Sequence, residues 1–342
     1  MGVIINTTLA ISIATISAGF AYYFYQLKKK VKVPGKWTEI GIVKKLCIYP
    51  LKSGNRIEVS KAECTEVGLR QCKDDDPTYQ LRDRGLIVYG DKDHEFRTAR
   101  TYPKMVLIDV GVHDEDHLSI DAPTMRTLYV KIPKKTDDNT LKIKCHKGEE
   151  IIGIDCGEEA ASWFSRYILG KSTGLALAYH DASSRRDITR THKQLLDYYL
   201  NLTNDSTGLY SDLSRVLIVN QQSVNDLNKK IGSGTHVSVN NFRPNLVVDG
   251  TQIQPYTEDE WDWVKVGDVL FRKVKECTRC ILTTVDPETV TRSTDREPLK
   301  TLETYRMSDG PAKLPVMCIN TEVKRNGVIH VGDTVYFAKD AE

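Results

Sequence analysis

The sequence predicts a mainly β protein with some α-helix (α+β), made of two β-barrel domains that follow one transmembrane helix. Three observations lead to this prediction. Short apolar runs recur along most of the chain and are separated by Gly, Asp and Pro, which is typical of antiparallel barrels and sandwiches. A few longer segments carry apolar residues at helical spacing. The N-terminal end contains a long stretch without any charged residue.

Length and composition indicate a globular protein with a local binding site. The chain has 342 residues, of which 40% are hydrophobic and 27% charged, enough for two domains of ordinary size. The formal net charge is +2, so composition alone does not favour nucleic acid as a partner. Eight cysteines in a chain of this length are sparse for a secreted disulfide framework. We expect a reducing compartment, with most cysteines acting as small buried hydrophobes.

The N-terminal stretch, residues 3–25, carries no charge and is followed directly by Lys28, Lys29 and Lys30. Roughly 20 apolar residues suffice to cross a bilayer as a helix. Lysines that follow such a segment place the rest of the chain on the cytosolic side. The alternative is a cleaved signal peptide, but a basic n-region is missing and the apolar run is long. The sequence therefore predicts a signal anchor over residues 1–30.

The first β domain is expected over residues 38–170. Its predicted strands are residues 42–43, 46–49, 86–89, 105–110, 118–120, 127–132 and 141–143. The segment 155–169 then has Ala161, Phe164 and Ile168 on one helical face, and Gly170 follows as a C-terminal cap. These elements favour an antiparallel barrel or sandwich closed by one helix.

The second β domain is expected over residues 185–339, after a loop-rich segment 172–190. A short helix is predicted at 193–200, a buried strand at 216–219, a helix from Ser223 to Gly232, and a strand at 245–250. Two later segments, 264–271 and 329–337, each carry Gly-Asp between apolar runs, and we expect a hairpin at each. Such hairpins would form the rim of a second barrel.

The stretch with the most chemical content is Cys277-Thr278-Arg279-Cys280. A Cys-x-x-Cys spacing permits half of a structural zinc site, but zinc usually takes four ligands and no second cysteine pair exists. A thioredoxin-like pair requires a βαβ context, whereas the flanks look like strands. A pair of buried thiols and a single thiolate bound to a soft metal centre are the other two interpretations.

Several cations lie in turns beside predicted strands, namely Lys52, Arg84, Arg97, Arg100 and Arg243. Each alone is most simply a solvated surface charge. Together with small polar neighbours they would suit the phosphate of a bound cofactor. The proline at 244 is expected to hold the preceding arginine in extended geometry. Further hydrogen bonds could come from Ser53, Ser211, Asp212 and Ser214.

Common nucleotide and hydrolase motifs are absent from the sequence. We find no Gly-x-Gly-x-x-Gly turn, Walker loop, His-Glu-x-x-His or Gly-x-Ser-x-Gly elbow,. If the chain performs redox chemistry, its electrons must therefore come from a partner.

Four motifs in this order carry a resemblance to a known family. They are Tyr49-Pro50-Leu51-Lys52-Ser53, Leu81-Arg82-Asp83-Arg84, Asn241-Phe242-Arg243-Pro244-Asn245, and the run from Cys277 to Pro287. The chain resembles, over roughly residues 41–337, the MOSC-domain proteins with an N-terminal β-barrel, and among them the mitochondrial amidoxime-reducing components. The resemblance implies a molybdenum–molybdopterin cofactor (Mo-MPT), with Cys280 as metal ligand and catalytic residue.

The same resemblance implies a set of site residues. Lys52, Ser53 and Arg84 would hold the pterin and its phosphate. The pocket would be completed by Asp212, Leu213 (through its backbone), Ser214, Arg243 and Thr278. Asp212 is also our candidate for a proton relay, with a turn or capping role as the alternative. The resemblance also places Cys318 where the family often has a pocket aromatic.

The implied activity is reduction of N-hydroxylated substrates, amidoximes and hydroxylamines, by cleavage of the N–O bond. Electrons would come from cytochrome b5 and its NADH-dependent reductase, and nucleic acid is not expected as a partner. The implied location is the outer mitochondrial membrane, with a single span and the catalytic part facing the cytosol. Two alternatives remain: a molybdenum-cofactor carrier or sulfur-transfer module without reductase activity, and a structural zinc or scaffold protein.

Overall fold

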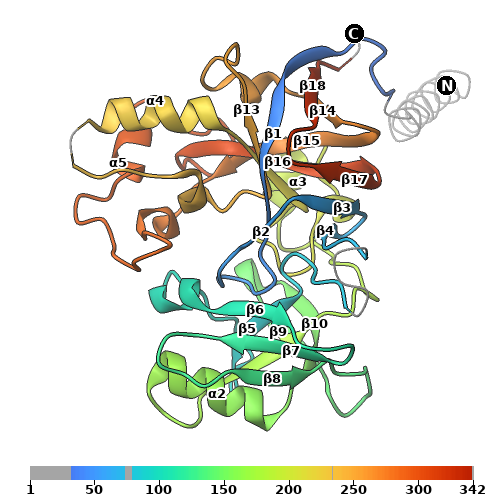
Figure 1. Ribbon diagram of the computed structural model, residues 1–342, viewed down its shortest axis with the longest axis vertical. Helices are drawn as coiled ribbons and strands as arrows, with labels where there is room; N and C mark the ends of the chain where they lie inside the picture. Colours follow the sequence, from blue (N-terminus) through green and yellow to red (C-terminus); the bar gives the residue numbers. More distant parts are fainter. Residues whose placement is uncertain (1–31, 74–78, 233, 341–342) are drawn as a thin grey trace, which may run out of the picture. The chain divides into compact units, whose positions relative to one another are not determined.

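The computed structural model describes residues 32–73, 79–232 and 234–340. The predicted anchor lies outside these residues, and no helix within them is long and apolar enough to cross a membrane. Trp37–Lys339 form one compact unit, which is mainly β (Figure 1).

The largest sheet closes on itself as a barrel. Its order is β13-β12-β16-β15-β14-β18-β1-β2, and an added pairing of β13 with β1 closes the ring, leaving β2 outside. The barrel strands are β1 (Thr38–Ile48), β12 (Val216–Asn220), β13 (Leu246–Asp249), β14 (Trp263–Val266), β15 (Val269–Thr278), β16 (Val316–Arg325) and β18 (Thr334–Ala338). Its interior is apolar and fully buried, with Val43, Leu46 and Phe271 among its residues. Closure leaves the pairing edges of these strands satisfied.

The first strand of the chain belongs to this barrel. In β1, Leu46 pairs with Leu246 of β13, and Ile42 pairs with Thr334 of β18. The short β2 (Ile57–Val59) pairs antiparallel with the end of β1. A small sheet of β17 (Gly327–His330), β3 (Lys61–Thr65) and β4 (Gly68–Arg70) also joins the two ends of the chain. Residues from the expected first domain therefore complete the sheet of the second.

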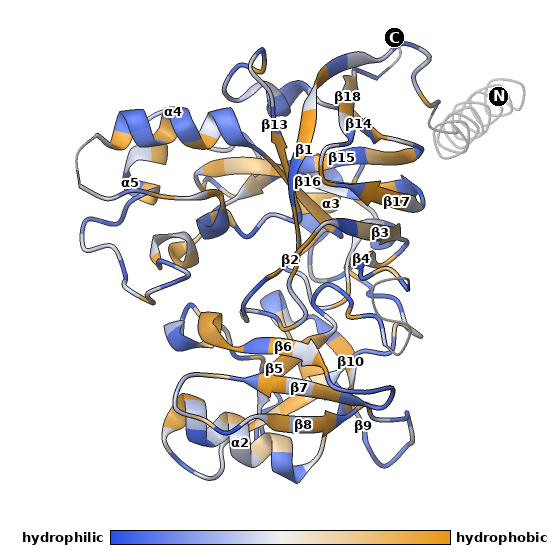
Figure 2. Cartoon of the chain, in the orientation of Figure 1, coloured by the Kyte–Doolittle hydropathy of each residue, from blue (hydrophilic) through white to orange (hydrophobic). Residues whose placement is uncertain are grey.

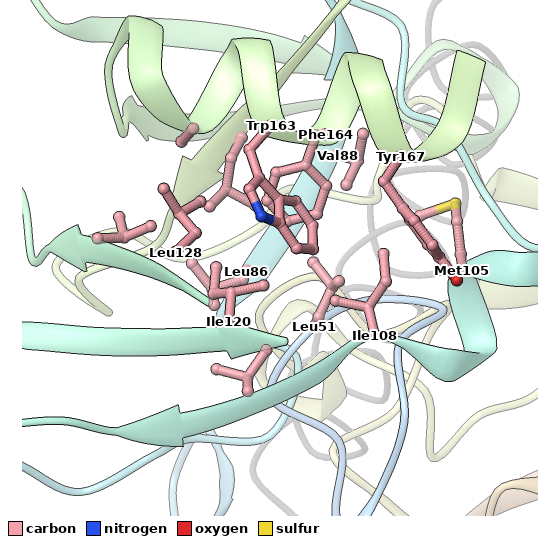
Figure 3. Packing of buried hydrophobic residues seen from close by; sticks show 14 of the residues in the cluster. Leu51, Leu86, Val88, Met105, Ile108, Ile120, Leu128, Trp163, Phe164 and Tyr167 are labelled. Carbon is pink, nitrogen blue, oxygen red and sulfur yellow. The ribbon is translucent and has the colours of Figure 1, made fainter. Parts of the chain in front are cut away.

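The segment between these parts forms two further antiparallel sheets. They contain β5 (Leu86–Gly90), β11 (Leu175–Tyr179), β10 (Glu150–Asp155) and β9 (Thr140–Lys144) in one, and β6 (Asp109–Val112), β7 (His117–Asp121) and β8 (Leu128–Lys131) in the other. Strand pairing does not join the two sheets within the described residues. Helix α2 (Glu158–Leu169) packs Trp163, Phe164 and Tyr167 onto their shared apolar core (Figure 3).

The remaining helices are short. They are α3 (Lys193–Tyr198), α4 (Gln221–Ile231), α5 (Leu299–Leu302) and the 3-10 turns η1 (Pro103–Leu107), η2 (His146–Gly148), η3 (Asn204–Ser206), η4 (Val239–Phe242), η5 (Thr257–Glu260) and η6 (Ile281–Thr284). Helix α4 is amphipathic (Figure 2), with Val224 and Leu227 buried. Its N-cap is Asn220, whose side chain accepts a hydrogen bond from the backbone N–H of Gln222,.

Most predicted elements are confirmed. Gly170 ends α2 in the left-handed conformation with φ 70°,. The predicted hairpin at 264–271 is β14–β15, and Gly267 takes φ 54° at its bend. Glycine suits this position because it has no Cβ to clash.

Three expectations are wrong. The segment 329–337 is no hairpin, because β17 pairs with β3 while β18 pairs with β1 and β14. The turn between them bonds to β1 instead, through Gly332 and Asp333 to Val43. The expected strand 105–110 begins as η1, which has a proline in its first turn,. The expected loop 172–190 contains the fully buried strand β11.

The buried carboxyl of Glu258 in η5 generates a stability prediction. Its Oε2 accepts hydrogen bonds from Ser223 and Asn220, but Oε1 has no partner. Burial raises the pKa of Glu258 from 4.5 to about 7. The protonated carboxyl therefore stabilises the fold fully below pH 4.5, and this contribution is lost as the pH rises through about 7,.

Between pH 4.5 and about 7, we expect the unfolding free energy of the wild type to fall by about 3 kcal/mol as Glu258 ionises,. The Glu258→Gln variant should not show this fall, because its side chain cannot ionise. Urea titrations at several pH values measure the difference between wild type and variant. The exposed Glu115→Gln serves as the control and should leave the pH dependence unchanged. Parallel curves for wild type and Glu258→Gln would contradict the prediction.

Candidate functional site

A cavity of about 390 Å³ brings together all of the predicted site residues. They come from five separate segments of the sequence and are Lys52, Ser53, Arg84, Asp212, Leu213, Ser214, Arg243, Thr278 and Cys280. Arg100 also lines the cavity, but Arg97 does not and pairs with Asp93 instead. Cys318 is fully buried in an apolar cluster and is not part of the lining.

The lining is strongly cationic. Among the described residues that form it, Asp212 is the one carboxylate. The seven cationic side chains are Lys52, Arg84, Arg100, Lys147, Arg243, Lys275 and Arg279. Cations gathered around one cavity repel each other unless an anion lies between them. The cavity therefore suits a ligand with several negative charges or acceptor oxygens.

A buried carboxylate outside the lining, Asp83, fixes three segments of the site. Its Oδ1 accepts from the backbone N–H of Tyr49 at 2.9 Å and from Nδ2 of Asn245 at 2.8 Å. Its Oδ2 lies 2.5 Å from Nη1 of Arg84. Tyr49 follows β1, Asn245 precedes β13 and Arg84 lies in the loop before β5. One side chain therefore sets the spacing of these three segments.

Two arginines stack on the ring of Tyr49. The guanidinium carbons of Arg84 and Arg243 lie 4.4 Å and 4.3 Å from the ring centroid, within the range of cation–π attraction. Burial, together with the charge of Arg84, lowers the pKa of Arg243 to about 10. Nη2 of Arg243 is buried and has no hydrogen-bond partner. A buried donor without a partner is costly, and a phosphate or carboxylate in the cavity would satisfy it.

Three of the site residues have left-handed backbones. The φ angles are 69° at Ser53, 50° at Arg84 and 55° at Arg243. The expectation of extended geometry before Pro244 is therefore wrong. The left-handed region is the alternative that also avoids the right-handed clash with the proline ring, and here the N–H of Arg243 bonds to the carbonyl of Asn240 at the end of η4.

Lys52 and Asp212 form an ion pair that joins the two expected domains. Nζ of Lys52 lies 2.5 Å from Oδ1 of Asp212 and donates to the carbonyl of Tyr210 at 2.7 Å. The side chain of Lys52 is buried, whereas that of Asp212 is 69% exposed. Desolvation in the surrounding cavity would by itself raise the pKa of Asp212. The charge of Lys52 and a contact with His146 outweigh this effect, so the pKa of Asp212 lies well below its usual value. Asp212 is thus an anion at neutral pH.

The two cysteines of the Cys-x-x-Cys segment have different surroundings. Nη1 of Arg279 donates to Sγ of Cys277 at 2.8 Å, and Cys277 packs against the apolar cluster that contains Cys318. Both cysteines line the cavity, and Cys280 stands at the start of η6. All eight cysteines are free thiols, and no cluster of three or more His, Cys, Asp or Glu side chains occurs in the described part of the chain. The structure therefore gives the zinc interpretation no second set of ligands.

A buried ion pair between Arg186 and Glu149 holds the loop that carries Asp212. Nε and Nη2 of Arg186 each lie 2.7 Å from a carboxylate oxygen of Glu149. The same guanidinium donates to the carbonyl of Ser211 at 2.7 Å through Nη1. Both side chains are almost completely buried. The pair therefore sets the position of the backbone next to Asp212.

Sequence reasoning missed several residues of this arrangement. Arg186 lies in the segment 172–190, which was expected only to be loop-rich, and Asp83 appeared only as part of a motif. His146 and Lys275 carried no signal. The aspartate between Arg82 and Arg84 in a strand-flanking turn could have been recognised as a partner for the cations. The role of Arg186 could not, because its partner Glu149 lies 37 positions away.

Comparison with known proteins identifies the class to which this fold and site belong. A model of the MOSC N-terminal beta barrel domain matches residues 40–171, and a model of the MOSC domain matches residues 205–336. The chain is 37% identical over 303 residues to mitochondrial amidoxime-reducing component 1 of Mus musculus, covering 87% of this chain and 82% of that protein.

Two human proteins give similar values. Identity is 37% to mitochondrial amidoxime-reducing component 1 of Homo sapiens, with 87% of this chain and 83% of that protein covered. Identity is 36% to mitochondrial amidoxime reducing component 2 of Homo sapiens, with 87% and 84% covered. The chain belongs to the family of the amidoxime-reducing components, within the MOSC-domain proteins.

The buried pair behind the Asp212 loop yields a test of its structural role. We expect Arg186→Met to lower the unfolding free energy by about 3–5 kcal/mol, because it leaves the carboxylate of Glu149 buried without a partner. The double variant Arg186→Met/Glu149→Leu should recover much of that loss.

Urea unfolding measures both variants. The adjacent Arg185 pairs with Glu66 at the exposed surface, so Arg185→Met is a matched control with an expected cost below about 1 kcal/mol. Equal costs for the variants at 185 and 186 would show that the buried pair does not hold the loop.

Proposed function

We propose that this chain is an oxidoreductase that holds a molybdenum–molybdopterin cofactor in the cavity and reduces amidoximes and hydroxylamines. The names of the relatives support amidoxime reduction. The observation that carries the proposal is the unpartnered Nη2 of Arg243, in a cavity that is cationic and also contains the thiol of Cys280. An anionic cofactor with a soft metal fits both features.

The chain's residues divide into two groups around such a cofactor. Cys280 would supply the protein's sulfur to the metal. The groups that would hold the pterin and its phosphate are the side chains of Lys52, Ser53, Arg84, Ser214, Arg243 and Thr278, together with the backbone of Leu213. When bound, the cofactor supplies two-electron oxygen-atom transfer chemistry.

Each N–O bond cleaved takes up two electrons and two protons and releases one water molecule. Asp212 is ionised and open to the cavity, so it can accept a hydrogen bond from an N–H or O–H of the substrate. Lys52 keeps that carboxylate in place. In this arrangement Asp212 orients the substrate, and as an anion at neutral pH it has no proton of its own to donate.

The electrons are proposed to come from cytochrome b5 and its NADH-dependent reductase, since the sequence contains no nucleotide-binding motif. The relatives' names include the word mitochondrial, which supports a mitochondrial location. We further propose that residues 3–25 anchor the chain in the outer membrane with the cavity on the cytosolic side. Extraction of mitochondria and protease protection would test this placement.

Metal and pterin analysis of the purified chain tests the proposal, together with an NADH-driven amidoxime assay containing the haem partner and its reductase. Molybdenum with pterin and reduction of benzamidoxime would support it. Zinc, or no metal, would exclude it. Molybdenum and pterin without reductase activity would favour the cofactor-carrier alternative.

The unequal surroundings of the two cysteines predict unequal variants. We expect Cys280→Ala to lower kcat more than about 100-fold. Mutation of residues that support a metal site without contacting the metal costs up to about 100-fold, and a direct ligand should cost more. Cys277→Ala should have the smaller effect, because Cys277 packs in an apolar cluster. Activity and metal content are measured on both. Wild-type activity in Cys280→Ala would remove Cys280 from the proposed role.

The place of Arg243 in the cavity allows a prediction of how much its charge contributes to cofactor binding. A charge-assisted hydrogen bond contributes about 1.5–3 kcal/mol, so Arg243→Met should weaken cofactor binding roughly 10–100-fold. The measurement is pterin content after gel filtration. Arg97→Met is the matched control, because Arg97 lies outside the lining, and its cofactor content should equal that of wild type. Full retention by Arg243→Met would contradict the proposed binding mode.

A further inference from the structure

His146 occupies a position between the cavity and solvent. It lies in η2 and lines the cavity, and its side chain is 31% exposed. The ring packs edge-on against Phe96, with centroids 4.6 Å apart and an interplanar angle of 77°. The next residue, Lys147, is exposed. The imidazole therefore reaches the cavity while it keeps access to bulk water.

One ring nitrogen of His146 faces both a cation and an anion. Its Nε2 lies 2.6 Å from Nη2 of Arg100 and 3.5 Å from Oδ1 of Asp212. A guanidinium can only donate hydrogen bonds. Nε2 must therefore be the acceptor, which places the single proton of the neutral ring on Nδ1.

Protonation reverses the preference of this nitrogen. A hydrogen on Nε2 is repelled by Arg100 and attracted by the carboxylate of Asp212. His192 is a further titratable group nearby, and burial lowers its pKa. The other charged groups near the ring are Lys147 and, on the far side of Asp212, Lys52. These groups oppose a positive ring, so Asp212 is the group that favours it. Gain and loss of one proton thus exchange the partner of His146.

We propose that His146 carries protons from solvent into the cavity, with Asp212 as the partner of its protonated form. The inference rests on the proposed function, in which each N–O cleavage takes two electrons from the haem donor and two protons from solvent. In each transfer the Nε2–H bond breaks and an O–H bond of the departing water, or the N–H bond of the product, forms. The neutral ring then returns to Arg100 and is protonated again from solvent.

The kinetic test uses His146→Gln, which can hydrogen-bond but not titrate. We expect kcat to fall about 100-fold, at the lower end of general acid–base contributions, with KM and cofactor content near wild type. The decrease of kcat with rising pH that we expect in the wild type should be absent from this variant. Added imidazole should restore activity to His146→Ala, more so at lower pH. The exposed His113→Gln is the control and should match wild type.

A second measurement needs no cofactor. In the apo-protein, ring ¹H–¹⁵N spectra at alkaline pH should show His146 with Nδ1 protonated and Nε2 bare. A ring protonated on Nε2 would overturn the inference, as would a His146→Gln variant with wild-type kcat and pH profile. If the wild-type chain contains no molybdenum and reduces no amidoxime, the proposed function fails as well. An active wild type with an unaffected His146→Gln variant refutes only the role of His146.

Discussion

The geometry of the cavity depends on the buried carboxylate of Asp83. A buried charge is tolerated only when it is paired and hydrogen-bonded, and Asp83 meets this requirement with three donors from three segments. Arg84 and Asn245 line the cavity, and Tyr49 supports it. Tyr49 provides the ring on which Arg84 and Arg243 stack, and Asn245 also bonds to the carbonyl of Cys47. One anion thus fixes the guanidinium of Arg84 and the segment of Tyr49, on whose ring Arg84 and Arg243 stack, and further cations line the same cavity.

The closure of the barrel explains why residues so distant in sequence meet. Strand β1 runs antiparallel to β13, with Leu46 opposite Leu246. The end of β1 therefore lies beside the beginning of β13, which brings the Tyr49–Ser53 turn next to Arg243. Strand β12 runs parallel to β13, so Ser214, which precedes β12, arrives at the same end. The site is a consequence of strand register, and it requires strands from both expected domains.

Local patterns in the sequence predicted the parts of the structure that depend on local physics. The left-handed cap at Gly170, the hairpin at Gly267 and the gathering of Lys52, Arg243 and Cys280 in one site follow from turn chemistry or from motifs. The failures arise where distant strands compete. Residues 329–337 have hairpin chemistry, but β3 and β1 offer both halves better pairing. The strand β11 has no polar alternation because both of its faces are buried, and Arg186 and His146 acquire their partners only through the fold.

The positions that break local rules coincide with the cavity. A left-handed backbone at a residue other than glycine costs on the order of 1–3 kcal/mol, and three such residues, Ser53, Arg84 and Arg243, line it. To this is added a buried guanidinium nitrogen without a partner. The backbone N–H groups of Arg84 and Arg243 bond to the carbonyls of Tyr49 and Asn240, but Nη2 of Arg243 has no partner. An anion in the cavity would satisfy this donor and reduce the repulsion between the cations, so both effects would contribute to affinity for a negatively charged ligand.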